Sequence, residues 1–287
     1  MKITCFVLLL TLITTLSAQQ WQRKAEGVEV REALFNSTLA GQLPTSSTLK
    51  SGDIEYEISH RFVPAINEDD ANFGFDGPVK MRMALSYGLS DYLMVTLGRS
   101  NVMDNYDLRF KYNLYHDSVA ENPYEFAVQA GIATNSQTPD ILDRSAFDGD
   151  NIQFYVQGIF NIMFAERKFG VGVVPSYLYN SMIFSIEKQY TFNVGTYAQY
   201  FFNRMFSLRV EYMPIVAGYQ GYVEAGETGE RSYNTLAFNL DIETGGHVFQ
   251  IMATNNLRLN PSQYLVGAND SASSGDWHLG FGILRVF

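Results

Sequence analysis

The sequence has a single cysteine, four histidines and, beyond its first 18 residues, no long apolar stretch. The cysteine, Cys5, lies in a segment that we expect to be removed, so the mature chain has no disulfide, catalytic thiolate or cysteine-ligated metal. No window after residue 18 approaches the ~20 apolar residues of a membrane-spanning helix. The formal net charge of −10 makes the chain a poor candidate for nucleic-acid binding.

The N-terminus has the order of a secretory signal peptide. Lys2 precedes an apolar stretch over residues 3–16, and the small residues Ser17 and Ala18 follow it. We expect cleavage after Ala18. A retained N-terminal anchor is the alternative, and the shortness of the apolar stretch argues against it.

Aromatic residues are abundant, while the chain as a whole is not hydrophobic. They make up 14% of the sequence, mostly as 18 Tyr and 21 Phe, whereas the mean hydropathy is only −0.08. A transmembrane β-barrel combines these features, because only alternate residues face lipid and aromatic residues form girdles at the membrane surface. A soluble β-sandwich has a similar composition, so the periodicity must separate the two.

Alternation of apolar and polar residues predicts strands along the whole chain after residue 52. In residues 107–114 one face is Leu/Phe/Tyr/Leu and the other Asp/Arg/Lys/Asn. The total is about 12 strands of roughly 9–13 residues, long enough to span a bilayer when tilted, whereas soluble sandwiches use shorter strands. The clear strands are 54–59, 80–87, 107–114, 124–134, 207–213 and 235–243, and the weaker ones are 92–99, 151–163, 168–179, 189–202, 246–255 and 276–287.

Long and short connections mostly alternate between these strands. Short periplasmic turns and long outside loops are typical of outer-membrane barrels, and the pattern implies an even strand number with both chain ends in the periplasm. The long connections are 64–79, 135–150, 217–232 and 256–275, and the tight turns are 88–91, 165–167, 203–204 and 245–246.

The C-terminal residue agrees with this interpretation. Phe287 closes an alternating strand and resembles the signal that outer-membrane assembly machinery recognises; an ordinary final strand is the alternative. We therefore predict an all-β fold, a closed antiparallel up-and-down transmembrane β-barrel, in which the first and last strands pair. The expected parts are a signal peptide (1–18), an N-terminal segment that is periplasmic or luminal (19–51) and the barrel (52–287).

Charged side chains lie on the strand faces that would line the lumen. Basic strands would then face or adjoin acidic strands. Such an arrangement would set up a transverse field that selects solutes by charge, whereas the alternative is that the charges pair and fill a small lumen. The candidate lumen charges are Glu55, Glu57, Lys80, Arg82, Arg109, Lys111, Asp241 and Glu243.

Patterns for catalysis or metal binding are sparse. The four histidines lack the i, i+2 or i, i+4 spacing of metal ligands, and the chain has no GxSxG motif. The acidic stretches 68–70 and 148–150 are most simply solvated loops, with a bound divalent cation as the alternative. We expect no catalytic, cofactor or metal site, and no enzyme.

Several short stretches carry a family resemblance: ISHRF (58–62), FGFDG (73–77), LSYGLSD (85–91), GRS (98–100), LRFKY (108–112), GHVFQ (246–250) and TN (254–255). Together they resemble an uncharacterised bacterial family catalogued as domain of unknown function 5777, although Val63 stands where glycine is expected. The resemblance implies a membrane barrel and no established activity. If the family has a function, the positions to test are His60, Arg61, Asp76, Arg99, Lys111, His247 and Asn255; alternatively, these residues organise rims and turns.

The sequence thus predicts a protein of a Gram-negative outer membrane and leaves its function open. The first hypothesis is a narrow passive pore for small polar solutes. The second is a closed barrel that serves as a binding or assembly partner, and the third is a barrel enzyme acting on lipid or peptide. The expected partners are outer-membrane lipid and the barrel assembly machinery, and the oligomeric state is left undefined.

Overall fold

The computed structural model describes residues 33–287 apart from 118–119, 146–147, 186, 222 and 224–230. The expected signal peptide, and residues 19–32 of the expected N-terminal segment, lie outside this part. The strands are β1 (Ile54–Phe62), β2 (Val79–Ser90), β3 (Leu93–Ser100), β4 (Asn105–Asp117), β5 (Tyr124–Asn135), β6 (Ile152–Phe164), β7 (Phe169–Tyr179), β8 (Tyr190–Phe201), β9 (Phe206–Met213), β10 (Ile215–Gly218), β11 (Thr235–Glu243), β12 (His247–Thr254) and β13 (His278–Val286).

Helices are short in the part of the chain that the structure describes. They are α2 (Thr138–Leu142), the 3₁₀ helix η2 (Gly149–Asn151) and α3 (Pro261–Tyr264). Among these residues, no helix is long and apolar enough to cross a membrane.

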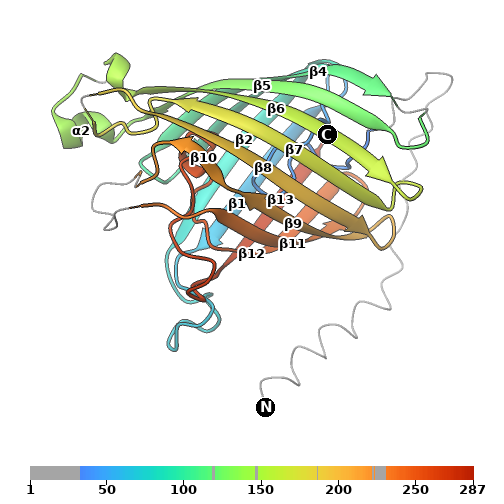
Figure 1. Cartoon of the computed structure of the whole chain (residues 1–287). Helices are drawn as coiled ribbons and strands as arrows, with labels where there is room; N and C mark the ends of the chain where they lie inside the picture. Colours follow the sequence, from blue (N-terminus) through green and yellow to red (C-terminus); the bar gives the residue numbers. More distant parts are fainter. Residues whose placement is uncertain (1–32, 118–119, 146–147, 186, 222, 224–230) are drawn as a thin grey trace. The chain divides into compact units, whose positions relative to one another are not determined.

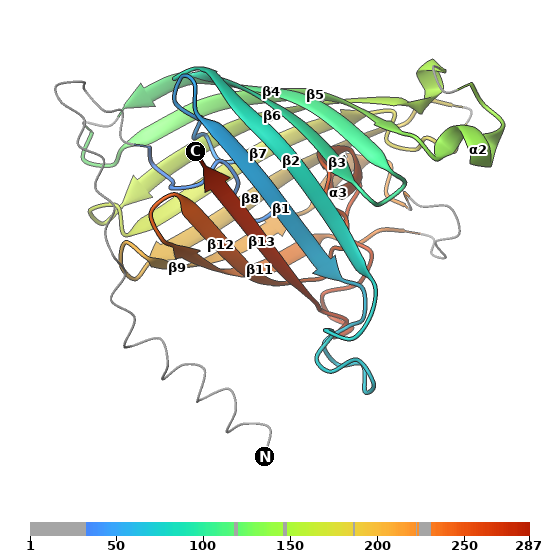
Figure 2. The same ribbon diagram turned by 180° about the vertical axis from the view of Figure 1, so that it is seen from behind.

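The strands form one closed antiparallel sheet (Figures 1 and 2). Neighbours in sequence are neighbours in the sheet, and β1 pairs with β13 from Glu55↔Val286 to Arg61↔Gly280. The predicted pairing of the first and last strands is therefore confirmed, as is the up-and-down barrel. Apart from the short β10, which pairs with β8, closure gives every strand a partner on both sides, as a membrane interior demands.

The thirteen strands make a twelve-stranded barrel, because β9 and β10 are two parts of one strand. Both pair with β8, and they are separated by Pro214. Proline has no N–H to donate to a neighbouring strand, so the ladder breaks at this residue and resumes at Ile215 with an irregular register. The predicted number of about 12 strands is confirmed.

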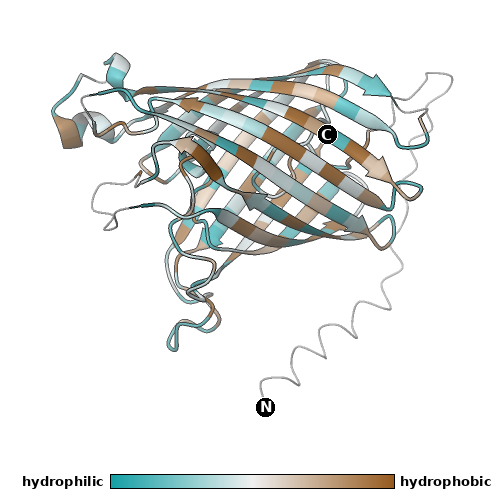
Figure 3. Cartoon of the chain, in the orientation of Figure 1, coloured by the Kyte–Doolittle hydropathy of each residue, from teal (hydrophilic) through white to brown (hydrophobic). Residues whose placement is uncertain are grey.

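The faces of the strands invert the pattern of a soluble protein. Along β4 the buried side chains are polar or charged, and the exposed ones are Tyr106, Leu108, Phe110, Tyr112, Leu114 and Tyr115. Figure 3 shows the same alternation of hydrophilic and hydrophobic residues along the neighbouring strands. Exposed apolar residues suit a surrounding of lipid, and the buried polar residues then line the lumen.

The two ends of the barrel differ in the length of their connections. We call the end where β1 begins and β13 ends the terminal rim, and the opposite end the loop rim. Most turns at the terminal rim are tight, although six residues separate β4 from β5. The turn between β11 and β12 has three residues, of which Gly245 and Gly246 have positive φ, of 67° and 106°. Glycine adopts these angles without strain, which explains the Gly-Gly pair at a hairpin turn.

A charge placed on the lipid-facing surface tests this assignment. Leu97 lies in the middle of β3, and its side chain is 61% exposed. We expect Leu97→Arg to lower the free energy of unfolding by about 2–4 kcal/mol, because the guanidinium would enter hydrocarbon. Urea unfolding in phospholipid vesicles measures this change, with Leu97→Met as the control. A loss below about 0.5 kcal/mol would contradict a lipid-facing Leu97.

Candidate functional site

Two segments that do not belong to the wall fill the lumen. The N-terminal plug comprises residues 34–49, and the inward loop comprises residues 255–268 of the connection between β12 and β13. Every residue of the inward loop is buried, as are most residues of the plug. The sequence pattern placed residues 256–275 outside the barrel, whereas the structure folds the first half of this connection into it.

The plug is a tight hairpin rather than a strand of the sheet. The Ala40 N–H donates to the Leu43 carbonyl at 2.7 Å, and the Thr45 N–H donates to the Thr38 carbonyl at 3.1 Å. The β-bridge described for this segment, Leu39↔Pro44, is internal to it. The plug is therefore bonded to the barrel mainly through side chains of the wall, and the Thr48 hydroxyl adds one bond to the Asp91 carbonyl, at 2.8 Å.

Charged side chains of the wall bind the plug by its backbone. Lys111 Nζ donates to the carbonyls of Thr38, at 2.8 Å, and Thr45, at 3.1 Å. Arg209 Nη2 donates to the Ala40 carbonyl at 2.7 Å. On the same hairpin, the Glu211 carboxylate accepts the N–H groups of residues 41 and 42. The lumen thus satisfies both the donors and the acceptors of the plug with buried charged groups.

Two apolar side chains of the plug lie in hollows floored by glycine. A Cβ on Gly170 would lie 2.6 Å from the Phe35 ring, and a Cβ on Gly195 would lie 2.7 Å from Leu43. Phe35 also makes an edge-on contact with the Tyr197 ring at 5.6 Å between centroids. Because any larger residue at these glycines would clash, the wall is shaped to this segment.

The inward loop is bonded to the wall on the other side of the lumen. Asn260 bonds to Asn105 and accepts from Arg82. Gln263 Nε2 donates to the Val102 carbonyl at 2.8 Å. Further along, Asn193 Nδ2 donates to the carbonyl of residue 265 at 2.9 Å. The loop therefore spans the lumen between β3–β4 and β8.

The plug and the inward loop meet inside the barrel. Gln42 Nε2, at the tip of the plug hairpin, donates to the Arg258 carbonyl at 2.7 Å. Arg258 in turn donates to the carbonyls of Gly267, at 2.9 Å, and Gly221, at 3.2 Å. One hydrogen-bonded path therefore connects a segment entering at the terminal rim with a loop from the loop rim.

Six of the eight candidate lumen charges are buried, and four of these six lie in ion pairs. Arg82 lies between Glu57, at 3.1 Å, and Asp107, at 2.5 Å. Arg109 lies 3.6 Å from the second Glu57 oxygen. The acids and bases are thus interleaved on β1, β2 and β4 rather than separated into an acidic and a basic wall. Such pairing cancels much of a transverse field.

The remaining candidates occupy different levels of the barrel. Glu55 accepts the Thr38 hydroxyl at 2.6 Å, and Asp241 pairs with Arg209 at 2.9 Å. Lys80 is half-buried near the loop rim, and Glu243 is half-buried at the terminal rim, where it accepts from Asn36.

Several lumen residues were not among the candidates. Asp107, Arg209 and Glu211 lie on polar faces that the period-two pattern had already identified, so their inward direction was readable from the sequence. Glu125 accepts from the plug residue Ser46 at 2.5 Å, a contact that no strand pattern contains. Arg258 lies outside any strand, and no sequence signal points to it.

The family-motif residues do not gather in one site. His60 faces outward, with its ring 5.2 Å from that of Phe62, whereas its neighbour Arg61 is fully buried in the lumen. Asp76 is exposed in the connection after β1, and Arg99 pairs with Asp104 near the loop rim. Among the hydrogen bonds of the described residues, Lys111 is the one family-motif residue that bonds to the plug.

The last two motif residues support turns and rims. His247 stacks on Phe249 at 5.9 Å between centroids, close to the terminal rim. Asn255 donates to the carbonyls of Asn234, at 2.9 Å, and Asp270, at 2.7 Å. This residue therefore anchors the start of the inward loop. The C-terminal strand closes with the Phe287 N–H donating to the Ile54 carbonyl at 2.8 Å.

Groups suited to metal binding are dispersed. Over the described ranges, the structure brings together no three His, Cys, Asp or Glu side chains that would hold an ion. In the acidic stretch 148–150, Asp148 accepts the Asp150 N–H at 2.9 Å, and Lys188 pairs with Asp150. The hydrogen bond that Lys188 donates to the Asp150 carboxylate, together with the lysine charge, lowers the pKa of the Asp150 carboxyl below its ordinary value.

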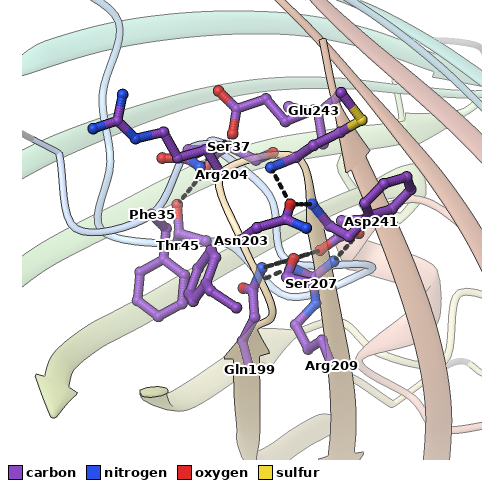
Figure 4. Close-up of a pocket in the computed structure, with 15 residues that line it drawn as sticks. Phe35, Ser37, Thr45, Gln199, Asn203, Arg204, Ser207, Arg209, Asp241 and Glu243 are labelled. Atoms are coloured by element: carbon purple, nitrogen blue, oxygen red, sulfur yellow. Dashed lines mark hydrogen bonds and ion pairs between the residues drawn. The ribbon is translucent and has the colours of Figure 1, made fainter. Parts of the chain in front are cut away.

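A pocket at the terminal rim marks the border between plug and wall (Figure 4). Phe35, Ser37 and Thr45 contribute the plug side. On the wall side, Gln199 Nε2 donates to Ser207 at 2.7 Å and to an Asp241 oxygen at 3.2 Å. Gln199, Ser207 and Asp241 therefore bond to one another at this rim, whereas Glu243 accepts from Asn36 of the plug.

Removing the central arginine tests the pairing in the lumen. Arg82→Met leaves the Glu57 and Asp107 carboxylates buried without their shared partner, so we expect a loss of about 3–5 kcal/mol in unfolding free energy. Arg99→Met breaks a pair whose side chains are 38% and 32% exposed, and we expect a loss below about 1 kcal/mol. Urea unfolding in vesicles compares the two variants. Equal losses would contradict the account.

Filling the glycine hollows tests the fit of the plug. We expect Gly170→Val combined with Gly195→Val to displace Phe35 and Leu43, because their side chains occupy that space. Proteinase K should then cleave residues 34–49 about tenfold faster, since local opening controls proteolysis. The control is Gly158→Val, where a Cβ would meet Pro175 only at an ordinary 3.5 Å. Unchanged cleavage in the double variant would show that the hollows do not hold the plug.

Comparison with known proteins supports the fold. An outer membrane channel from Pseudomonas putida F1 has 12% identity and a TM-score of 0.51, covering 84% of this chain and 98% of that chain. The NanC porin has 9% identity and a TM-score of 0.47, covering 81% and 98%. LpxR from Salmonella typhimurium has 8% identity and a TM-score of 0.35, covering 82% and 100%. At these identities, only the first likeness carries weight, and it shows a shared fold.

A search of curated proteins finds no match. A family model described as a membrane bound beta barrel domain, domain of unknown function 5777, matches residues 35–287. This match includes most of the plug together with the whole barrel. The resemblance noted in the sequence is thereby confirmed. The chain belongs to this family of membrane-bound β-barrel domains.

Proposed function

We propose that the chain is an outer-membrane channel for small polar solutes, held closed by the N-terminal plug and the inward loop. The observation that carries the proposal is a complete barrel whose polar lumen is occupied by a segment outside the sheet. The described β-bridge of the plug is internal, and the plug's bonds to the barrel involve wall side chains. The plug can therefore leave while all strand pairs remain.

The polar lumen supports passage of water-soluble molecules. Buried side chains of the wall include Gln129, Gln157, Asn161 and Asn193, besides the ion pairs. A barrel that only needed a rigid interior would be equally stable with apolar residues, since buried ion pairs seldom add net stability. Polar walls are expected where water and solutes replace the plug.

The location follows from the fold and the chain ends. Bacterial barrels of this kind reside in the outer membrane, with short turns and both termini on the periplasmic side. Residues 1–18 have the features of the signal peptide that export requires, with cleavage after Ala18. We therefore assign the terminal rim, where the plug enters, to the periplasm. The alternative function is a permanently closed barrel that binds a partner, and such a barrel would show no conductance.

A disulfide lock on the plug tests the proposal. A Cβ on Gly41 would lie 3.1 Å from Asn239 Cγ, and the corresponding Cβ–Sγ separation across a disulfide is about 3 Å. We expect oxidised Gly41→Cys/Asn239→Cys protein to stay closed in planar bilayers. Reduction should restore openings like those of the parent chain. The single-cysteine variants are controls that should not respond to reduction.

Deletion of the obstructing segments provides the decisive conductance measurement. We expect a variant lacking residues 34–47 to pass at least about tenfold more mean current than the parent, and a variant that also lacks residues 256–267 to pass more still, because the inward loop obstructs the lumen as well. Folding is checked by heat-dependent electrophoretic mobility. If a folded variant that also lacks residues 256–267 passes no more current than lipid alone, the channel proposal is wrong and the closed-barrel alternative stands.

A further inference from the structure

The wall binds the plug mainly as a peptide backbone rather than as a particular sequence. Donors and acceptors of wall side chains reach carbonyls and N–H groups of the plug at eight places. The carbonyls are those of Thr38, Ala40, Pro44, Thr45 and Ser46, and the N–H groups are those of Gly41, Gln42 and Ser46. Most of this recognition would be available to any peptide.

We propose that the vacated lumen binds short zwitterionic peptides with an apolar side chain, and that these peptides are solutes of the channel. The inference rests on the proposed channel function and names its solute class. It follows from the groups that lose a partner when the plug leaves, and from the hollows that the plug uncovers.

The departing plug frees both a cation and anions in one lumen. Lys111 loses both of its carbonyl acceptors, and Glu211 loses both N–H donors. Glu55 and Glu125 lose the hydroxyl donors of the plug. Glu211 keeps Arg209 at 3.7 Å and Glu125 keeps His116, but both lose the direct hydrogen bonds of the plug. A ligand that carries an ammonium and a carboxylate replaces such charge-assisted bonds better than a neutral one.

The spacing of these groups suits a peptide of about three residues. Lys111 binds the carbonyl of Thr38, and Glu211 binds the N–H of Gly41, three positions further along the same chain. A tripeptide that runs in the opposite direction to the plug can therefore present its C-terminal carboxylate to Lys111 and its N-terminal ammonium to Glu211. Gln250, which binds the Ala40 carbonyl in the plugged state, can donate to an internal amide.

The hollows add selectivity for an apolar side chain. Leu43 occupies the space above Gly195, and it belongs to an apolar cluster with Ile159 and Val174. After the plug leaves, this cluster is exposed to the lumen beside the charged groups. A leucine-like side chain would bury this apolar cluster again, whereas a sugar of similar size would leave the cluster exposed to water. Peptides are thereby distinguished from saccharides.

Binding to the plug-deleted barrel tests the inference directly. Isothermal titration in detergent, with the variant lacking residues 34–47, compares the tripeptide alanyl-leucyl-alanine with its acetylated and amidated form and with raffinose. We expect the free tripeptide to bind at least about tenfold more tightly than the capped tripeptide or raffinose. Neither of these two carries the charged ends that would contact Lys111 and Glu211.

Substitutions of Lys111 and Glu211 distinguish binding at this site from nonspecific binding. We expect Lys111→Met and Glu211→Gln each to weaken binding of the tripeptide about tenfold. Ser86→Ala is the matched lumen control, because Ser86 bonds to Thr96 on the neighbouring strand. Equal affinity of the tripeptide and raffinose, or unchanged affinity in both charge variants, overturns the inference. If the barrel conducts ions but binds no peptide, this inference is wrong, while the proposed channel function is still supported.

A measurement on the undeleted chain covers the case in which the deletion does not fold. In Gly41→Cys/Asn239→Cys protein, a bound tripeptide competes with the plug and slows disulfide formation. We expect at least a threefold slower rate at saturating tripeptide, by mass action on the plugged state. No slowing, with raffinose as the comparison, would contradict peptide binding in the lumen.

Discussion

Closure of the sheet is the constraint on which the rest of this structure depends. In hydrocarbon each strand must have its backbone bonded on both sides, and the pairing of β1 with β13 completes this requirement. Pro214 breaks one strand and is tolerated because β9 and β10 both remain paired with β8. With the wall complete, the lumen segments are free to serve another purpose than holding the barrel together.

Closure also creates the problem that those segments solve. A twelve-stranded barrel encloses a lumen, and its inward side chains must be hydrated or bonded to protein. Ion pairs such as Glu57–Arg82–Asp107 satisfy part of the wall from within. Lys111 is instead bonded to carbonyls of the plug, and Glu211 accepts N–H groups of the plug besides its ion pair with Arg209. The plug therefore both obstructs the lumen and occupies its binding groups. The groups that hold the proposed channel closed are then the same groups that would bind its solute.

The barrel was predictable from sequence because its signals are local. Period two places Leu108 and Phe110 outward and Arg109 and Lys111 inward within a single strand. Pairing of charges depends on which strands adjoin, so the link between Arg82 and Asp107 needed the register. The sequence offered a luminal position for residues 19–51 as only one of two alternatives, and it did not place the inward loop. The contact between these segments could not be predicted, because Gln42 and Arg258 lie 216 positions apart and neither belongs to a strand.

The central claim is that the plug opens while the barrel stays folded, and amide hydrogen exchange of the protein in lipid nanodiscs tests it most directly. The account predicts that amides of residues 38–46 exchange through an opening of much lower free energy than those of β1 and β13. Exchange of the plug and of these strands at one common rate would mean that the plug leaves only when the barrel unfolds, and would contradict the account.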